Sequence, residues 1–212
     1  MTLETSKNLG GIGAILIVIG VLPIPYATIL SLIGLILTMV GLKGLADFYK
    51  EGGIFNNALY AIILAIVGVV ITVGLLVVMF VGTLLELGIN ISSIGDWATL
   101  GTQLTTIFTD FSNFGVLFNL LGAIAISLII LFVFAIIAVF FFRRSLTQLA
   151  SKTGVGLFGT AGLLMLIGAV LTIIVVGALL IWIAWILVAV AFFRIRAQST
   201  APTQTAPPPP PQ

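Results

Sequence analysis

The side chains that could do chemistry in this chain are mainly carboxylates. The sequence contains no His and no Cys, which excludes imidazole bases, thiolate nucleophiles, disulfides and the usual ligands of zinc, copper and haem. Its hydroxyl side chains have no obvious general base beside them. The carboxylates form one set of Glu4, Asp47 and Glu51 and a second set of Glu86, Asp96 and Asp110. We therefore predict no catalytic residue, no cofactor and no metal site.

Two of the carboxylates lie in one short segment with two lysines. Lys43 and Asp47 are four residues apart, the spacing of an ion pair on one helix face, although in the weaker orientation. Asp47 and Glu51 could hold a cation only with three or more further oxygen ligands. The segment is better interpreted as a helix end that runs onto a membrane surface.

The composition excludes a soluble protein. Apolar residues make up 61% of the 212 positions and charged residues 7%, whereas a soluble domain carries about 25% charge. The net charge of +2 is too weak to indicate a nucleic-acid partner. The chain is therefore predicted to be an integral membrane protein whose main partner is the lipid bilayer.

Uncharged runs at residues 8–42, 52–85, 111–142 and 153–193 predict the membrane spans. A span needs about 20 residues at ~1.5 Å each. The two middle runs are one span each, and the first and last must fold back as hairpins. Pro23 and Pro25 predict the turn of the first hairpin, between spans at 9–22 and 26–42. The last hairpin has no proline, so its turn is assigned to Gly177 by elimination. The predicted fold is an all-α transmembrane bundle of about six spans: hairpin, two single spans, hairpin.

The basic residues predict the orientation of this bundle. With six alternating spans, all eight Lys and Arg fall on one side, and the opposite connections hold only acidic charges. By the positive-inside rule, both termini are then cytoplasmic and the protein lies in the cell membrane. Residues 9–22 are not predicted to be a cleaved signal peptide, because Pro23 and a second predicted span follow them instead of a small-residue cleavage site.

Small residues form two stripes at helical spacing. The first contains Ser31, Gly34, Thr38 and Gly41, and the second contains Ala61, Ala65, Gly68 and Thr72. Such stripes allow close approach of helix backbones. Packing within the molecule is the favoured interpretation, and the face of a homo-oligomer is the alternative.

The chain also resembles itself in two conflicting registers. Residues 42–62 resemble 144–165, which implies a repeated inner connection with its flanking spans. Separately, 13–22 resemble 161–170 and 31–41 resemble 181–191, which implies repeated hairpins. Apolar sequences match easily by chance, so duplication is left open.

The segment between the two middle spans predicts an amphipathic helix at the outer interface. Ser93 and Asp96 fit a weak capping box, and Trp97, Leu104 and Phe111 then recur at helical spacing. The other side of this helix is polar, with Thr99, Thr102, Gln103, Thr106, Thr109 and Asp110. A lid packed on the bundle is the favoured interpretation, and a gate or partner surface is the alternative.

Three amides lie within or beside the spans. Asn56 and Asn57 are predicted to cap the start of the third span, with contact to an entering solute as the alternative. Asn119 is predicted to form an interhelical hydrogen bond.

Residues 197–212 are predicted to form a disordered, proline-rich cytoplasmic tail beyond a transmembrane domain of residues 1–196. The tail contains six of the eight prolines and no hydrophobic residue larger than alanine. It cannot bury enough apolar surface to offset its ordering entropy. It is either a solvated end or a polyproline II docking strip for a cytoplasmic protein.

The strings LADFY and IFNNALYA around residues 43–60, with TAGLLMLIGAVLTII and WIAWILVAVAFF within 160–193, carry a resemblance to known proteins. Over most of residues 5–196 the chain resembles an archaeal family of predicted multi-pass membrane proteins of unknown function. The resemblance implies a shared fold and a cell-membrane location. It implies no activity.

The predicted role is non-enzymatic: a structural, scaffold or partner-binding membrane protein. The alternative is a channel or uniporter for a small neutral solute or ion, lined by hydroxyls, amides and carbonyls. No ionisable residue lies within the six predicted spans, which argues against proton-coupled transport. An enzyme would need Glu86, Asp96 and Asp110 to converge.

Overall fold

The structure, a computed structural model, describes residues 2–23, 25–86, 98–99, 101–102, 105, 114–174 and 176–196, and over these residues helices are joined by short turns, with no strand. The elements are α1 (Leu3–Gly20), α2 (Ala27–Phe48), α3 (Gly52–Glu86), α5 (Phe114–Thr153), α6 (Leu157–Leu171), the 3-10 turn η3 (Thr172–Ile174) and α7 (Val176–Phe193). Within the described part, five helices are long and apolar enough to cross a membrane: α2, α3, α5, α6 together with η3, and α7. α1 is not among them. The prediction of an all-α fold with several helices apolar enough to cross a membrane is thus confirmed, whereas the predicted number of six spans is not.

α1 begins earlier and is more polar than the predicted span at 9–22. Thr2 caps it: the Thr5 amide donates to the Thr2 hydroxyl at 3.2 Å, and the Ser6 hydroxyl donates to the Thr2 carbonyl at 2.9 Å. The cap draws Glu4 and Lys7 into the first two turns, which lowers the hydropathy of the helix.

α1 and α2 form the predicted N-terminal hairpin. α1 ends at Gly20 and α2 begins at Ala27, so the turn contains Pro23 and Pro25 as expected. Tyr26, just before α2, has a left-handed φ of 65°, and its side chain is exposed.

The predicted turn at Gly177 is wrong. The α6/α7 hairpin reverses at η3, and Gly177 lies in the first turn of α7. A Cβ on Gly177 would collide with the backbone of Gly168 and Thr172. This glycine allows the two helices to approach closely, and the 3-10 turn before it reverses the chain.

The first small-residue stripe packs within the molecule, as favoured. Gly34, Thr38 and Gly41 are buried under α1. A Cβ on Gly34 would lie 2.5 Å from the Gly13 carbonyl oxygen, and one on Gly41 would lie 2.5 Å from the Gly10 nitrogen. The second stripe is divided: Ala61, Gly68 and Thr72 are buried, whereas Ala65 is exposed.

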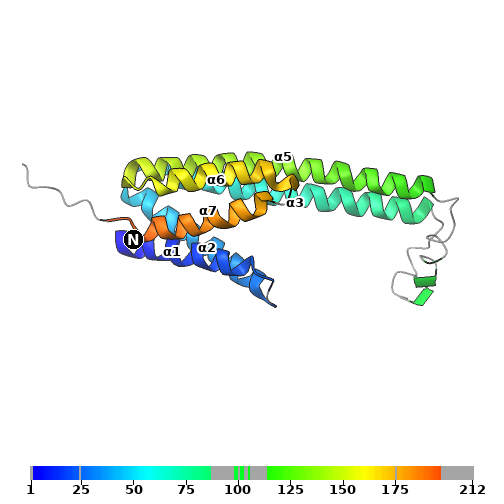
Figure 1. Ribbon diagram of the computed structural model, residues 1–212, viewed down its shortest axis with the longest axis horizontal. Coiled ribbons are helices and arrows are strands. Elements are labelled where there is room, and N and C mark those ends of the chain that lie inside the picture. Colours follow the sequence, from blue (N-terminus) through cyan, green and yellow to red (C-terminus); the bar gives the residue numbers. More distant parts are fainter. Residues whose placement is uncertain are drawn as a thin grey trace, which may run out of the picture.

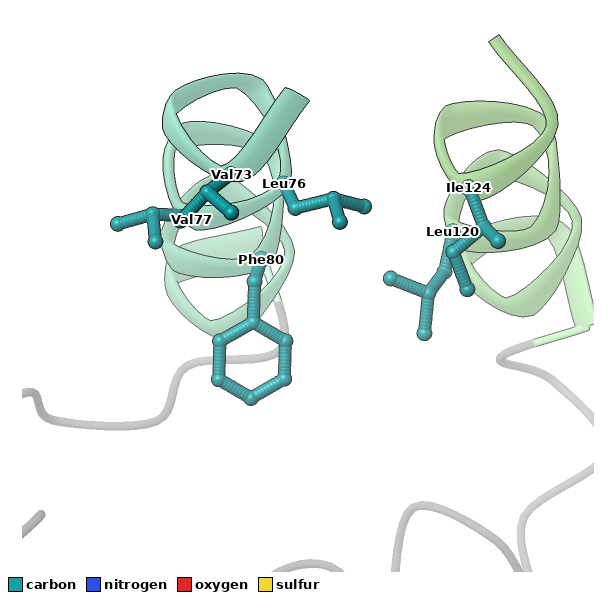
Figure 2. Close-up of a pocket in the computed structure, with 6 residues that line it drawn as sticks. All are labelled: Val73, Leu76, Val77, Phe80, Leu120 and Ile124. Carbon is teal, nitrogen blue, oxygen red and sulfur yellow. The ribbon is translucent and has the colours of Figure 1, made fainter. Parts of the chain in front are cut away.

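α3 and α5 are much longer than the other helices. They contain 35 and 40 residues, compared with 15 in α6 and 22 in α2. The two pack against each other and run on beyond the ends of α1, α2, α6 and α7 (Figure 1). Each of the two middle runs thus contains one long helix, as predicted, and the two helices pack together as an antiparallel pair. Where the pair projects, Leu76 of α3 and Leu120 and Ile124 of α5 point into a groove between them (Figure 2).

The tightly packed core lies at the opposite end of the molecule. The largest fully buried apolar side chains there come from α2, α3, α5, α6 and α7 and from the residues just after α7: Leu42, Leu45, Ile54, Leu146, Leu149, Phe158, Val188, Phe192 and Ile195. At this end α2 joins α3, and α5 joins α6 (Figure 1). Both connections contain a left-handed residue, Lys50 with φ 54° and Gly154 with φ 71°.

Candidate functional site

The packed end carries every basic residue of the chain and is called the basic end below. Lys7 lies in α1, Lys43 near the end of α2, and Lys50 in the connection that follows it. Arg143, Arg144 and Lys152 lie in the last part of α5, and Arg194 and Arg196 just after α7. The helices thus bring together residues that are almost 190 positions apart in the sequence.

Polar contacts tie α3 to α5 at the basic end. The Ser145 hydroxyl, fully buried, donates to the Ile54 carbonyl at 2.5 Å. The Asn57 amide donates to the Gln148 side chain at 3.1 Å and to the Gly53 carbonyl at 2.7 Å. These contacts fix the register of the two long helices.

The same contacts correct the prediction for the two asparagines. α3 begins at Gly52, so Asn56 and Asn57 lie inside the helix and do not cap it. Asn57 instead joins two helices, and Asn56 is exposed. Sequence reasoning missed Ser145 and Gln148. The available signal was their spacing: the two polar side chains lie three residues apart, on one helix face, directly after two arginines.

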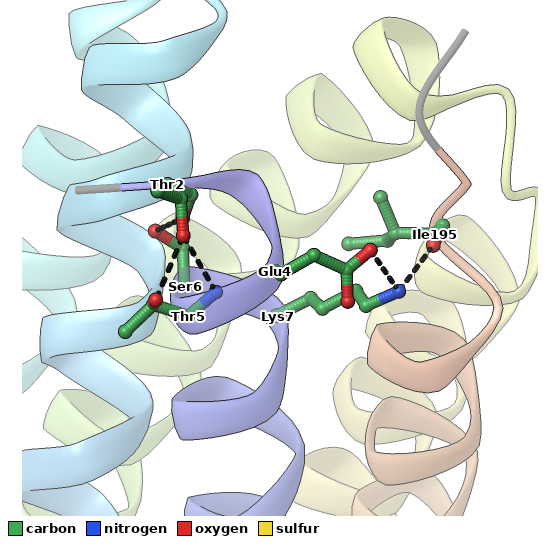
Figure 3. Close-up of polar contacts among 6 residues, drawn as sticks. All are labelled: Thr2, Glu4, Thr5, Ser6, Lys7 and Ile195. Atoms are coloured by element: carbon green, nitrogen blue, oxygen red, sulfur yellow. Dashed lines mark hydrogen bonds and ion pairs between the residues drawn. The ribbon is translucent and has the colours of Figure 1, made fainter.

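The two described chain ends are also joined at the basic end. The Lys7 ammonium donates to the Ile195 carbonyl at 3.3 Å and pairs with Glu4 at 2.8 Å (Figure 3). Ile195 is itself fully buried. The position at which the chain leaves the bundle is therefore held against α1.

The predicted pair of Lys43 and Asp47 is confirmed, with 3.6 Å between nitrogen and oxygen. Both side chains are exposed, so the pair contributes little to stability. The Lys43 ammonium also lies 5.1 Å from the centre of the Phe55 ring. Glu51 pairs instead with Lys152 at 3.1 Å.

Each carboxylate at the basic end thus forms an ion pair with a different lysine. Among the described residues, no three Asp or Glu side chains lie together as a metal site. Burial raises the pKa of the Tyr49 phenol above its ordinary value. Of the second carboxylate set, Glu86 is exposed at the far end of α3, and Asp96 and Asp110 lie outside the described residues.

The projecting part of α3 and α5 holds the second candidate site. Its groove has a volume of about 420 Å³, within the range of pockets that bind small molecules. The lining is purely hydrocarbon: Val73, Leu76, Val77, Phe80, Leu120 and Ile124 (Figure 2). A site of this chemistry accepts an apolar surface and offers nothing to an ion or a polar solute.

Two buried hydroxyls lie about one turn closer to the basic end than the groove. Thr72 on α3 and Ser127 on α5 are buried, and neither side chain has a hydrogen-bond partner. Thr72 is 18 residues from Ile54, and Ser127 is 18 residues from Ser145, which is about five full turns in each helix. Thr72 and Ser127 therefore repeat the facing positions of the bonded pair Ile54 and Ser145.

Other predicted features lie mostly outside the described residues. Of the amphipathic segment, residues 98–99, 101–102 and 105 are described, and all are helical. Thr102 donates to Ala98 and Thr99 carbonyls at 3.2 and 2.8 Å, as helical threonines do. Asn119 is exposed on α5. The proline-rich tail at 197–212 lies outside the described residues.

These features define a helical protein with several helices apolar enough to cross a membrane and a cross-linked basic end. Residues 30–186 match the model of a family described as proteins of unknown function, DUF996, and the chain belongs to that family. It is similar to the uncharacterised protein MJ1644 of Methanocaldococcus jannaschii, with 27% identity over 197 residues. The match covers 92% of this chain and 94% of that protein. No solved structure matches the chain.

Proposed function

We propose that this protein is a non-enzymatic scaffold of the cell membrane that presents a rigid basic surface to a cytoplasmic partner. The observation that carries the proposal is the cross-linked basic end. There the fully buried side chains gather, and hydrogen bonds and ion pairs join α1 to Ile195 and α3 to α5. Such a surface keeps its shape without a bound partner, which lowers the ordering cost of binding.

The orientation follows from the charges. With the basic end at the cytoplasmic face, no Lys or Arg faces the other side, in agreement with the positive-inside rule. α1 then serves as a sixth crossing beside α2, and both termini lie in the cytoplasm. The exposed Arg144 and Arg196 also face anionic lipid headgroups.

The proline-rich tail belongs to the same proposed surface. Residues 197–212 begin directly after Arg196, next to the point where Lys7 holds the Ile195 carbonyl. A run of five prolines, 207–211, loses little entropy on docking to an aromatic groove. We expect the tail to recruit the partner and the basic end to orient it.

The alternative, a channel or uniporter, has less support. The groove between α3 and α5 is lined by hydrocarbon only, and Thr72 and Ser127 are sealed inside the helix pair. A pathway for polar solutes needs polar lining groups, and none of the groove's lining side chains provides one.

A photo-crosslinking experiment in native membranes tests the scaffold proposal. A crosslinker replaces the exposed Thr147 at the basic end, and a control replaces the exposed Ile29 at the far end of the bundle. We expect one protein adduct at Thr147 that is lost when Arg144→Glu is added or residues 197–212 are removed. Passage of neutral solutes through proteoliposomes of the pure protein, with no charge-dependent adduct, would favour the channel and overturn the scaffold.

A further inference from the structure

The basic end carries more positive charge than its own carboxylates neutralise. It holds all eight Lys and Arg side chains and three carboxylates, and each carboxylate pairs with a lysine. Within the part of the chain that the structure describes, five basic side chains have no ion-pair partner: Lys50, Arg143, Arg144, Arg194 and Arg196. All arginines of the chain are among them, and arginine is the residue that binds phosphate through two parallel hydrogen bonds.

The rest of the chain has no further carboxylate side chain that can reach these arginines. Residues 197–212 contain no Asp or Glu. Glu86 ends α3, about 45 Å from the level of Arg143 on α5. Asp96 and Asp110 follow and precede the far ends of α3 and α5 by ten and four residues, at most about 36 Å and 14 Å of chain. The neutralising anion therefore has to come from another molecule.

Arg143 differs from the other four unpaired side chains because it is partly buried, whereas they are exposed. A Cβ on Gly162 of α6 would lie 3.1 Å from the Arg143 Cγ, so the arginine stem runs directly over the backbone of α6. Among the described residues, its guanidinium forms neither an ion pair nor a hydrogen bond. A stem that is already held loses little further conformational freedom when its head group binds an anion.

The position of Arg143 along α5 suits the depth of lipid headgroups. Arg143 directly follows the uncharged run of residues 111–142, so the hydrocarbon ends close to it. The headgroup layer beyond the hydrocarbon is about 5–8 Å deep. Lys152 lies nine residues farther along α5, about 14 Å beyond Arg143, and pairs with Glu51. Lys50, which precedes Glu51, therefore lies outside the headgroup layer, whereas Arg143 lies within it.

We propose that Arg143 binds the phosphodiester group of an anionic phospholipid at the surface between α5 and α6, with Arg144 as a second positive charge beside it. The planar guanidinium donates two hydrogen bonds to the phosphate oxygens. A zwitterionic lipid brings its own cation to the phosphate, so two arginines without a carboxylate favour a lipid of net negative charge. The inference takes from the proposed function only that the basic end lies at a membrane surface, and it requires no protein partner.

Lipid retention by the purified full-length chain tests this site. The protein is reconstituted in vesicles of equal amounts of phosphatidylglycerol and phosphatidylcholine, solubilised again in a mild detergent and repurified. The lipids that remain bound are counted by mass spectrometry. We expect phosphatidylglycerol to be retained in excess over phosphatidylcholine, because only phosphatidylglycerol carries a net negative charge.

Three single substitutions locate the binding. Arg143→Gln should lower the ratio of retained phosphatidylglycerol to phosphatidylcholine about fivefold, equivalent to the ~1 kcal/mol that one basic residue contributes near the headgroups. Arg144→Gln should also lower the ratio, and because Arg144 is exposed, this variant reports on binding even if Arg143→Gln disturbs packing. Lys50→Gln removes the same charge about 14 Å farther out, beyond a Debye length at physiological salt, and should leave the ratio unchanged.

An equal loss in Lys50→Gln and in the two arginine variants would show that retention follows net charge alone, and the site would be overturned. Equal retention of both lipids by the unsubstituted chain would overturn it as well. Inorganic phosphate added at constant ionic strength should not displace the lipid, because it lacks acyl chains; displacement would assign the site to a soluble phosphate instead. The scaffold proposal fails separately, since a Thr147 adduct in native membranes without lipid selectivity here would remove only the lipid site.

Discussion

Ser145 and Ser127 offer a matched pair of substitutions with opposite expected effects on the stability of the fold. Both are fully buried on α5, about five turns apart, and both face α3. Ser145 donates to the Ile54 carbonyl, whereas Ser127 has no hydrogen-bond partner. Alanine at each position removes one oxygen from almost the same setting, so the two variants isolate the contribution of the hydrogen bond.

The magnitudes follow from the two environments. Ser145→Ala loses one interhelical hydrogen bond, which costs about 0.5–1.5 kcal/mol, and membrane proteins average ~0.6. Ser127→Ala removes a buried hydroxyl whose desolvation is not offset by a hydrogen bond. We therefore expect the free energy of unfolding to stay the same or to rise by up to ~1 kcal/mol. Alanine raises helix propensity equally in both variants, and that contribution cancels in the comparison. The difference is about 1–2 kcal/mol, or roughly 5- to 30-fold in the unfolding equilibrium.

The measurement is reversible unfolding in lipid bicelles, followed by intrinsic fluorescence for both variants and the unsubstituted chain. We expect Ser127→Ala to be the more stable of the two. A double variant should show additive effects, because about 27 Å of helix separates the sites. If Ser127→Ala is destabilised as much as Ser145→Ala, then Ser127 has a partner and the interpretation of its environment is wrong.

Five further substitutions test the helix contacts and the proposed orientation. Gly34→Ala would bring a Cβ within 2.5 Å of backbone and should lower the stability of the bundle by about 1–3 kcal/mol, measured by thermal unfolding in detergent. Gly74→Ala has open space and should instead gain up to ~1 kcal/mol in the same assay. Gly177→Ala should separate α6 from α7, lowering the unfolding midpoint as Gly34→Ala does, and an unchanged midpoint would contradict the close contact. Ser92→Cys should react with an impermeant thiol reagent in intact cells and Thr200→Cys should not; labelling of Thr200→Cys would reverse the orientation.

The sequence predicted the features that depend on local chemistry. Uncharged runs gave the helices, because an apolar segment of that length has few other ways to satisfy its backbone in lipid. Two prolines located the first turn, because they remove donors and restrict the residues before them. The stripe of Gly34, Thr38 and Gly41 indicated a close contact, because its periodicity alone places it on one face.

Features that depend on partners far along the chain could not be predicted in the same way. Asn57 has the composition of a cap, and only the position of Gln148, 91 residues away, makes it an interhelical donor. Gly177 suits either a turn or a close approach, and the nearness of Gly168 decides between them. The groove arises because α3 and α5 are longer than the other helices. Charges mark the end of a predicted span but not the end of the helix, since α5 continues past Arg143 to Thr153.

The polar contacts are distributed unequally, and this links the two ends of the molecule. Most interhelical hydrogen bonds among the described side chains lie at the basic end. Farther along, the helices are held mainly by shape, with Gly68 against the Phe134 ring as an example. A bundle that is joined by hydrogen bonds at one end and packed by shape along the rest can keep its basic surface unchanged when the far ends of α3 and α5 shift. Filling the groove between α3 and α5 is therefore compatible with a rigid basic end, because no described hydrogen bond between the two helices has to break.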